Sequence, residues 1–279
     1  MNNELNIKEL VKEKYSEIAL QAKDTNSASC CGASGCSTIA LEIMSENYTS
    51  MEGYFADADL GLGCGIPTEF AQIKKGDTVV DLGSGAGNDA FVARSIVGDN
   101  GRVIGVDMTE TMIELSRRNA NKLQLQNVEF RLGDIEKIPI TSNKADVVVS
   151  NCVLNLVPNK IKAFSEMYRI LKPGGHFSVS DIVLSGALPQ ELVKEAEMYA
   201  GCVSGAIQKN VYLEIIEQNG FKNIEIKKEK AIILPDYILA NYLTAEQITN
   251  FKNSGTGIYS ITVFGEKPKD CGSGTDCCN

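Results

Sequence analysis

The chain has 279 residues, 43% of them hydrophobic, so it can bury one substantial core and still carry an appended lobe. Its 27 basic and 36 acidic residues leave a net charge of −9 without a dense block of Lys and Arg, which disfavours a surface that follows nucleic-acid phosphates. No apolar run approaches the roughly 18 residues that a membrane span needs. From the charge and the apolar pattern together, we expect neither nucleic acid nor a membrane as a partner.

The first six residues, Met1 to Asn6, lack the basic segment and apolar stretch of a secretory signal, which predicts a cytoplasmic protein. In that compartment the nine cysteines should be mostly reduced thiols and not a disulfide framework. The single histidine, His176, excludes a His-rich metal site and disfavours an imidazole general base. Any chemistry with a soft metal or metalloid must therefore use sulfur.

Apolar spacing predicts a helix over residues 6–22, then a cysteine-containing loop at 27–37 and a glycine-rich loop at 50–67. From residue 77 onward, short apolar strands alternate with helices. The strands are expected at 78–82, 102–107, 128–132, 145–150 and 176–183. The helices are expected at 89–97, 109–123 and 160–171, the last of them ended by Lys172-Pro173-Gly174-Gly175. This alternation predicts an α/β fold with a doubly wound, mostly parallel sheet.

Beyond Gly186 the pattern predicts a smaller C-terminal lobe that completes the sheet. Its helices are expected at 189–200 and 210–219, and a terminal pair of strands at 221–228 and 257–264. The chain then divides into an N-terminal extension of helix and cysteine loops, a ligand-binding core, the lobe with the substrate site, and a disordered cysteine-containing tail. The expected bounds of these four parts are 1–72, 73–186, 187–265 and 266–279.

The segment Asp81-Leu82-Gly83-Ser84-Gly85-Ala86-Gly87 joins the first strand to a helix. Glycines there permit positive φ and close approach of a ligand, and the helix N-terminal amides face that ligand. A nicotinamide dinucleotide site expects G-x-G-x-x-G and an acidic residue about 20 positions on, whereas this turn has G-x-G-x-G after Asp81. It resembles the first motif of class I methyltransferases, in which the turn lies under the methionine part of S-adenosylmethionine.

Three further strand ends add to this resemblance. A carboxylate at Asp107, followed by Met108, can accept hydrogen bonds from both ribose hydroxyls, although Asp107 alone would equally suit a turn or a helix N-terminus. Asp134 and Ile135 follow the third strand, where the family usually recognises adenine, and Asn151 ends the fourth strand, facing the methyl group. The resemblance implies a doubly wound core, 73–186, that binds S-adenosylmethionine. The implied binding residues are Asp81, Gly83, Ser84, Gly85, Gly87, Asp107, Met108, Asp134, Ile135 and Asn151.

Three cysteines from distant segments could converge over this site. Cys64 lies in the loop Leu62-Gly63-Cys64-Gly65, Cys152 at the carboxyl end of the fourth strand, and Cys202 in a glycine-flanked loop. Buried cysteines are common small hydrophobic residues, and packing explains Cys152 as well as function does. For Cys64 and Cys202, packing is the weaker explanation.

Five segments resemble arsenite methyltransferases: 54–65, the turn 81–85, 105–109, Ser150-Asn151-Cys152-Val153-Leu154-Asn155-Leu156-Val157-Pro158, and Gly201-Cys202 with 204–206. The resemblance implies that Cys64, Cys152 and Cys202 are catalytic and bind trivalent arsenic, and that Cys152 and Cys202 act in every round of methylation. A pyramidal thiolate site would direct the arsenic lone pair at the sulfonium methyl. No general base is required, because this nucleophile carries no proton.

The family also has a functional cysteine in the N-terminal loop, for which Cys31 is our candidate beside Cys30 and Cys36. Thiol exchange there would let glutathione or thioredoxin, as reducing co-substrate, reset the site after turnover. The tail cysteines could capture arsenic or be simple exposed thiols, and a zinc site would lack a paired C-x-x-C. These tail cysteines are Cys271, Cys277 and Cys278.

The sequence thus predicts a monomeric enzyme of arsenic detoxification that methylates thiol-bound arsenite and methylarsenite. Its partners would be arsenicals and small thiols or thioredoxin. One alternative is a small-molecule carbon or quinone methyltransferase, which shares the signature at 172–175 and would tolerate Ser at Cys152 or Cys202. The other is a non-enzymatic, thiol-based protein that sequesters arsenic or metal and has no need of S-adenosylmethionine.

Overall fold

The computed structural model describes residues 2–20, 46–188, 192 and 205–269. Within these ranges the chain forms a seven-stranded sheet in the order β3-β2-β1-β4-β5-β7-β6. Six strands run in one direction, and β7 runs in the opposite direction. The predicted α/β fold with a mostly parallel sheet is confirmed. The strands are β1 Thr78–Leu82, β2 Arg102–Asp107, β3 Val128–Leu132, β4 Ala145–Asn151, β5 Leu171–Ser185, β6 Lys222–Ile232 and β7 Gly257–Glu266.

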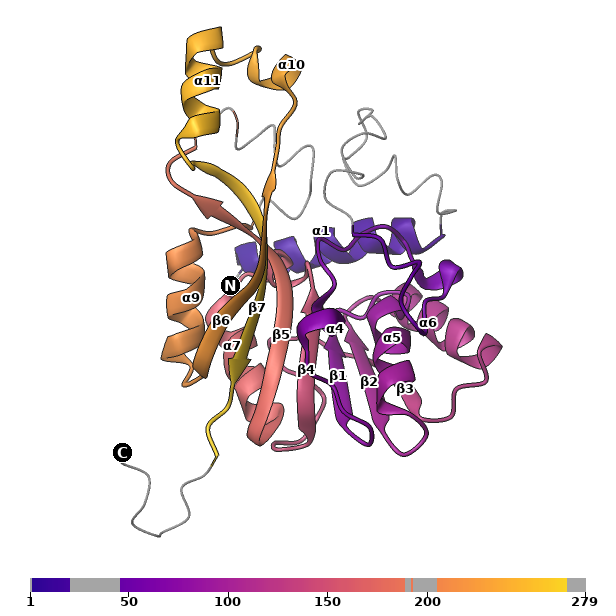
Figure 1. The fold of residues 1–279 in the computed structure, drawn as a ribbon. Helices are drawn as coiled ribbons and strands as arrows, with labels where there is room; N and C mark the ends of the chain where they lie inside the picture. The colour runs from indigo at the N-terminus through magenta and orange to yellow at the C-terminus, as the bar shows by residue number, and fades with distance from the viewer. Residues whose placement is uncertain (1, 21–45, 189–191, 193–204, 270–279) are drawn as a thin grey trace, which may run out of the picture.

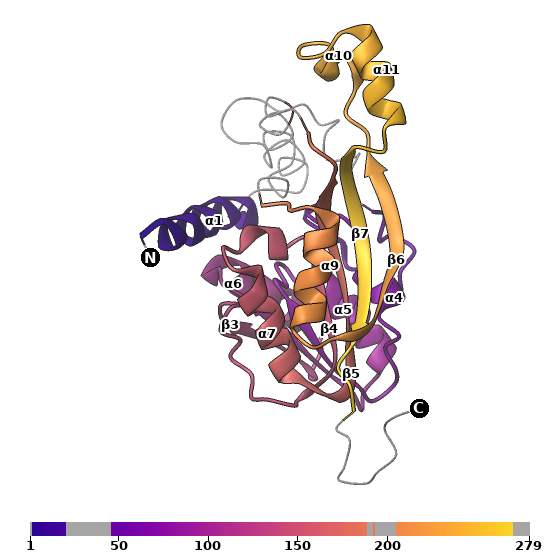
Figure 2. The same cartoon turned by 90° about the vertical axis from the view of Figure 1, so that its left-hand side faces the viewer.

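Helices cover both faces of this sheet (Figures 1 and 2). On one face lie α4 (Pro67–Phe70), α5 (Asn88–Val97) and α6 (Glu110–Lys122), and on the other lie α7 (Lys160–Ile170) and α9 (Lys209–Gln218). The remaining helices are α1 Asn2–Leu20, α10 Asp236–Leu239 and α11 Ala245–Asn253, and the 3-10 turns are η1 Ala56–Ala58 and η2 Leu154–Leu156. No helix within the described ranges has the length and apolar character that a bilayer span demands.

Successive residues of β1 pack into different cores, as expected for a parallel strand covered on both faces. Val79 belongs to the cluster that contains Phe91 of α5, while Val80 belongs to the cluster that contains Phe164 of α7. Both valines are fully buried. This double coverage explains why the predicted strands read as continuous apolar runs and not as an alternating pattern.

Two regions differ from expectation. Helix α7 ends at Ile170, as the stop signal at 172–175 predicted, but β5 begins at Leu171 and not at 176, because Leu171 pairs with Ala145 and the Gly174 amide donates to Lys267 O at 2.9 Å. Gly174 has a φ of +80°, so the strand bends there and continues. Helices α10 and α11 were not predicted, and they stand beyond the far end of β6 and β7 (Figure 1). The predicted helix at 189–200 and the loop at 27–37 lie outside the described residues, apart from Leu192.

The sheet reverses its winding direction between β1 and β4, since β2 and β3 follow on one side and β5 on the other. Ligands of such sheets bind at this point, outside the carboxyl ends of the strands. Helix α1, predicted at 6–22 and observed at Asn2–Leu20, runs across this edge (Figure 1).

Candidate active site

The glycine turn after β1 is held against β2 by its own backbone. The amides of Gly83 and Ser84 both donate to Val106 O, at 2.7 and 3.1 Å. Gly83 has a φ of +71°, and a Cβ placed there would lie 2.3 Å from a methyl of Val153. Gly87, with a φ of +102°, is the N-cap of α5. A side chain at position 83 would therefore displace the segment that follows β4, so the turn requires glycine there.

A cavity of about 1090 Å³, including its opening to solvent, lies at this edge of the sheet. Nine of the ten residues predicted to bind the cofactor line it, and Gly87 is the exception. Those nine are Asp81, Gly83, Ser84, Gly85, Asp107, Met108, Asp134, Ile135 and Asn151. The sequence prediction missed lining residues from the N-terminal extension and from helices, among them Val11, Tyr15, Tyr48, Asp89 and Met112.

Two carboxylates lie beneath the turn. Asp107 accepts hydrogen bonds from the amides of Gly85 (3.0 Å) and Thr109 (2.9 Å), and burial nonetheless raises its pKa. Asp81 is 2% exposed, and burial, followed by the negative charges of Asp89 and Asp107, raises its pKa well above the usual value. Among the described residues, Asp81 Oδ2 and Ser84 Oγ are buried without a hydrogen-bond partner.

This donor set fits S-adenosylmethionine. Buried carboxylates that repel one another favour a cationic ligand, and S-adenosylmethionine carries both an ammonium and a sulfonium group. Asp81 and Ser84 both line the cavity, and their partnerless Oδ2 and Oγ atoms leave hydrogen-bonding capacity unused. Around Gly85 a Cβ would meet nothing within 4 Å, so the turn leaves open space on the cavity side.

Asn151 joins the start of α5 to the cysteine loop. Its Oδ1 accepts the amide of Cys64 at 3.1 Å, and its Nδ2 lies 2.8 Å from Gly65 O and from the Tyr48 hydroxyl. The same Nδ2 lies 3.1 Å from Asp89 Oδ2, and the Tyr48 hydroxyl donates to Asp89 at 2.9 Å. The Asn151 side chain thus contacts the Cys64 loop as well as lining the cavity.

Tyr48 and Asp89 were missed at the sequence level. Burial raises the pKa of Asp89 to about 6, although hydrogen bonds from Asn151 and Tyr48 act in the opposite direction. Burial and the nearby Asp89 charge raise the pKa of Tyr48 well above its usual value, so Tyr48 keeps its proton. The position of Asp89 in the first turn of a helix after the glycine turn was an available signal for its role. No sequence pattern marked Tyr48.

Cys64 and Cys152 lie in one apolar cluster with Ile182, Leu234 and Ile258. They are 1% and 3% exposed, and Cys152 also lines the cofactor cavity. Cys152 has a φ of +61°, a conformation that costs free energy for a non-glycine residue and is common at functional sites. Its amide donates to Ser180 O at 2.8 Å, which fixes the bend after β4.

The structure therefore brings together two of the three predicted arsenic ligands, Cys64 and Cys152. The third, Cys202, lies outside the described residues, as do the candidates in the N-terminal loop and the tail. In the described part of the chain, no group of three His, Cys, Asp or Glu side chains is arranged to hold a metal ion. His176 places Nε2 2.7 Å from Ala71 O, a structural contact.

A buried polar group lies behind the thiols. The Tyr212 hydroxyl donates to Asp181 Oδ2 at 3.2 Å, and Ile182 N donates to Asp181 Oδ1 at 3.0 Å. Burial raises the pKa of Asp181 to about 7, although the positive charge of Lys160 opposes the shift. Burial and Asp181 raise the pKa of Tyr212, with smaller contributions from both thiols, so this group is electrostatically coupled to the cysteine cluster.

Comparison with known proteins gives the family. A methyltransferase-domain family model matches residues 73–235. The arsenite methyltransferase of Aquipseudomonas alcaligenes is 31% identical over 242 residues, which are 84% of this chain and 68% of that protein. The chain belongs to the arsenite methyltransferase family. A crystal structure of an arsenic(III) S-adenosylmethionine methyltransferase from Chlamydomonas reinhardtii has a TM-score of 0.60 at 31% identity, covering 85% of this chain and 75% of that one.

Other relatives are longer than this chain. The arsenite methyltransferase of Halobacterium salinarum is 40% identical over 245 residues, which are 82% of this chain and 61% of that protein. The chain thus spans about three fifths of this relative. Family membership agrees with the resemblance carried by the segments around Cys64 and Cys152.

Proposed function

We propose that this chain transfers methyl groups from S-adenosylmethionine to trivalent arsenic bound by protein thiols, with arsenite and methylarsenite as substrates. The observation that carries the proposal is the position of Cys152. It lines the cofactor cavity and at the same time packs in the buried cluster that contains Cys64. A thiol that borders both places can hold an acceptor next to a methyl donor.

The cofactor would lie along the carboxyl ends of β1, β2 and β3. S-adenosylmethionine supplies a methyl group made electrophilic by its sulfonium sulfur. The glycine turn and Asp81 would hold the methionine part, Asp107 the ribose hydroxyls, and Asp134 with Ile135 the adenine. Asp107 is well suited to this because two backbone amides already fix its carboxylate in place.

Cys64 and Cys152 would bind arsenic together with Cys202, which lies outside the described residues. Trivalent arsenic is soft, and sulfur is the soft ligand that proteins offer. Each thiolate would displace a hydroxide or a small-thiol ligand of the incoming arsenite. The apolar side chains around both cysteines exclude water and would hold the arsenic lone pair toward the cavity.

Attack by the arsenic lone pair forms the As–C bond, and the electron pair of the broken S–C bond stays on the leaving thioether sulfur. The arsenic is thereby oxidised by two electrons. Two equivalents of a small thiol such as glutathione, or one of thioredoxin, would return it to the trivalent state and become a disulfide. We propose Cys31 as the N-terminal cysteine that takes part in this exchange, in a monomeric, cytoplasmic enzyme.

No proton has to leave the nucleophile, so the reaction asks for no general base. The buried tyrosines agree with this, because burial and nearby Asp carboxylates keep Tyr48 and Tyr212 protonated. The local residues thus serve to position and to exclude water and not to accept a proton from the substrate.

The test is to incubate the purified chain with arsenite, glutathione and S-adenosylmethionine, and to separate the methylated arsenicals by chromatography with arsenic detection. Cys152→Ser and Cys64→Ser should each lower turnover by more than the ~10–100-fold that loss of a supporting group costs. The control variant Cys271→Ser should turn over like the wild type.

Two outcomes would contradict the proposal. Turnover of a carbon or quinone acceptor that survives Cys152→Ser would favour the small-molecule methyltransferase. Arsenite binding without any binding of S-adenosylhomocysteine in calorimetry would favour a sequestering protein.

A further inference from the structure

Helix α1 belongs to the N-terminal extension, and the proposed reaction gives it no part. It nevertheless lies across the carboxyl edge of the sheet (Figure 1), and Val11 and Tyr15 line the same cavity as Asp134 and Ile135. The helix therefore supplies wall to the cavity from outside the methyltransferase core.

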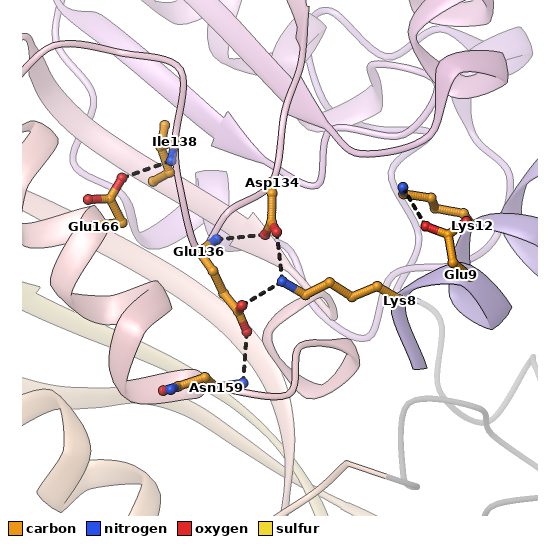
Figure 3. A network of polar contacts seen from close by, with 8 residues as sticks. All are labelled: Lys8, Glu9, Lys12, Asp134, Glu136, Ile138, Asn159 and Glu166. Atoms are coloured by element: carbon orange, nitrogen blue, oxygen red, sulfur yellow. Dashed lines mark hydrogen bonds and ion pairs between the residues drawn. The ribbon is translucent and has the colours of Figure 1, made fainter. Parts of the chain in front are cut away.

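Lys8 ties this helix to the loop after β3. Its Nζ lies 2.6 Å from Asp134 Oδ2 and 2.5 Å from Glu136 Oε2, as Figure 3 shows. The side chains of Lys8 and Glu136 are 16% and 8% exposed, so solvent and salt screen this pair less than a surface pair, while Asp134 is 37% exposed. Burial lowers the pKa of Lys8, but hydrogen bonds and charge from the two carboxylates outweigh it and raise the pKa above its usual value.

The same carboxylates connect Lys8 to the segment that follows Cys152. Glu136 Oε1 accepts the amide of Asn159 at 2.8 Å, and Asn159 caps α7 by accepting the amide of Lys162 (Figure 3 shows the Glu136 contact). Asp134 Oδ1 in turn accepts the amide of Glu136 at 2.8 Å. The Lys8 ammonium thus ties α1 to the loop after β3, and the Glu136 carboxylate ties that loop to the segment after β4.

The apolar side of α1 packs against residues that line the cavity or lead into the Cys64 loop. Ile18 and Ala19 are buried against Met112, which itself lines the cavity. Leu60 and Leu62, from the loop that leads into Cys64, pack against the same cluster. The helix therefore contacts the surroundings of both the cofactor and the thiols.

We propose that α1 is a strap that closes the adenine end of the cofactor cavity, and that Lys8 is the positioning residue that holds the strap shut and orients Asp134 toward the adenine. This inference rests on the proposed cofactor, S-adenosylmethionine. With Oδ1 bound to the Glu136 amide and Oδ2 to Lys8, the Asp134 carboxylate has one fixed orientation and keeps lone pairs for an exocyclic amine. The strap must open for cofactor to enter and product to leave.

The experiment compares two lysines of one helix. Lys12 pairs at 3.0 Å with Glu9 of the same helix and does not reach the core, as Figure 3 shows. Lys8→Met should weaken S-adenosylhomocysteine binding, measured by calorimetry without arsenic, by about tenfold, since it removes the partner of two partly buried carboxylates. Lys12→Met should stay within about twofold of the wild type, the usual effect of an exposed pair. Lys8→Arg should restore part of the loss.

A second measurement follows the strap itself. In the ligand-free protein, Lys8→Met should speed amide hydrogen exchange in α1 relative to Lys12→Met, and S-adenosylhomocysteine should slow that exchange in the wild type. If Lys8→Met binds S-adenosylhomocysteine as tightly as the wild type, the strap proposal is overturned and the proposed function stands. A wild-type chain that does not bind S-adenosylhomocysteine would overturn both. Failure to methylate arsenite alone would leave the strap intact.

Discussion

The site has two halves that are built in different ways. The cofactor half, made of the turn Asp81–Gly87 with Asp107 and Asp134, is set by backbone hydrogen bonds within short continuous segments. The thiol half, made of Cys64, Cys152 and the apolar cluster around them, is assembled from side chains far apart in the sequence. Asn151 touches both halves, because it lines the cavity and binds the Cys64 amide.

The difference suggests that the two halves tolerate change differently. A backbone turn fails when one residue cannot adopt its φ, whereas a side-chain cluster fails when a ligand or its support is removed. Single substitutions should therefore damage one half more than the other, except at Asn151. The following variants test this, in order of decreasing expected effect.

Gly83→Ala should damage the cofactor half more than the thiol half. The new Cβ would need a φ near +71° and would clash with Val153, so S-adenosylhomocysteine binding should weaken by about 100-fold or more. Binding of a trivalent phenylarsenical, followed by its As–S ultraviolet absorption with the tail cysteines changed to Ser, should weaken much less, through the shift of Val153 next to Cys152.

Gly76→Ala is the matched control, because Gly76 also has a positive φ, +89°, but a Cβ there meets nothing within 4 Å. It should bind both ligands like the wild type. Equal losses of phenylarsenical and S-adenosylhomocysteine binding in a folded Gly83→Ala protein would show that the halves are not separable.

Asn151→Ala should damage both halves. It removes the acceptor of the Cys64 amide and the donor to Asp89, and kcat/KM for arsenite should fall about 10–100-fold, as for other residues that orient ligands. Phenylarsenical binding should slow as well. Asn127→Ala, which removes hydrogen bonds to Gly98 O and Gly101 O away from the site, should leave both readouts unchanged.

The same contrast decides what the sequence could predict. The glycine turn, Asp107 and the strand ends were found because each is a contiguous pattern with a local physical cause. Nine of ten predicted cofactor residues line the cavity for that reason. For Cys64 and Cys152 the residues suggested only that they could converge over the site, and their shared role came from the family resemblance, since no local rule relates positions so far apart.

Apart from Asp89, which follows the glycine turn directly, the residues of the site that the sequence missed depend on contacts between distant segments. Tyr48 enters the site through one hydroxyl that reaches Asp89, and Lys8 through an ammonium that crosses to the loop after β3. Neither contact can be predicted from the spacing of residues in the sequence. The strand predicted at 176–183 begins earlier, at Leu171, for a related reason, since pairing with Ala145 and Lys267 extends it through the Pro and Gly residues that follow α7.

Asp181→Asn should change the pH dependence of stability behind the thiol half. Its folded pKa is about 7 against an ordinary value of 3.8, so between these values the native state binds the proton that the unfolded state has lost. Stability should therefore fall as pH rises from about 4 to about 7, by up to ~1.4 kcal/mol per pH unit from this group.

The charged and titratable groups that face Asp181 are Lys160 and Tyr212, and neither is changed in this variant. The difference in unfolding free energy between wild type and Asp181→Asn, from urea titrations at pH 5, 6, 7 and 8, isolates the contribution of Asp181 from that of other buried carboxyls. The unfolding free energy of Asp181→Asn should rise relative to that of the wild type as pH rises. A constant difference across this range would show that Asp181 does not titrate there.

Tyr48→Phe should have the smallest effect. It shows which half of the site the Tyr48 hydroxyl supports. It removes one buried hydroxyl that contacts Asp89, Asn151 and Gly65 O, and should cost about 1 kcal/mol of unfolding free energy. Phenylarsenical binding should weaken a few-fold while S-adenosylhomocysteine binding stays constant, because the hydroxyl supports the Cys64 loop. Tyr259→Phe, which loses an exposed bond to Gly255 O, should cost less and alter neither ligand. A reversed pattern, with the cofactor weakened and the arsenical unchanged, would assign Tyr48 to the cofactor half, where its contact with Asp89 of α5 would be the one that matters.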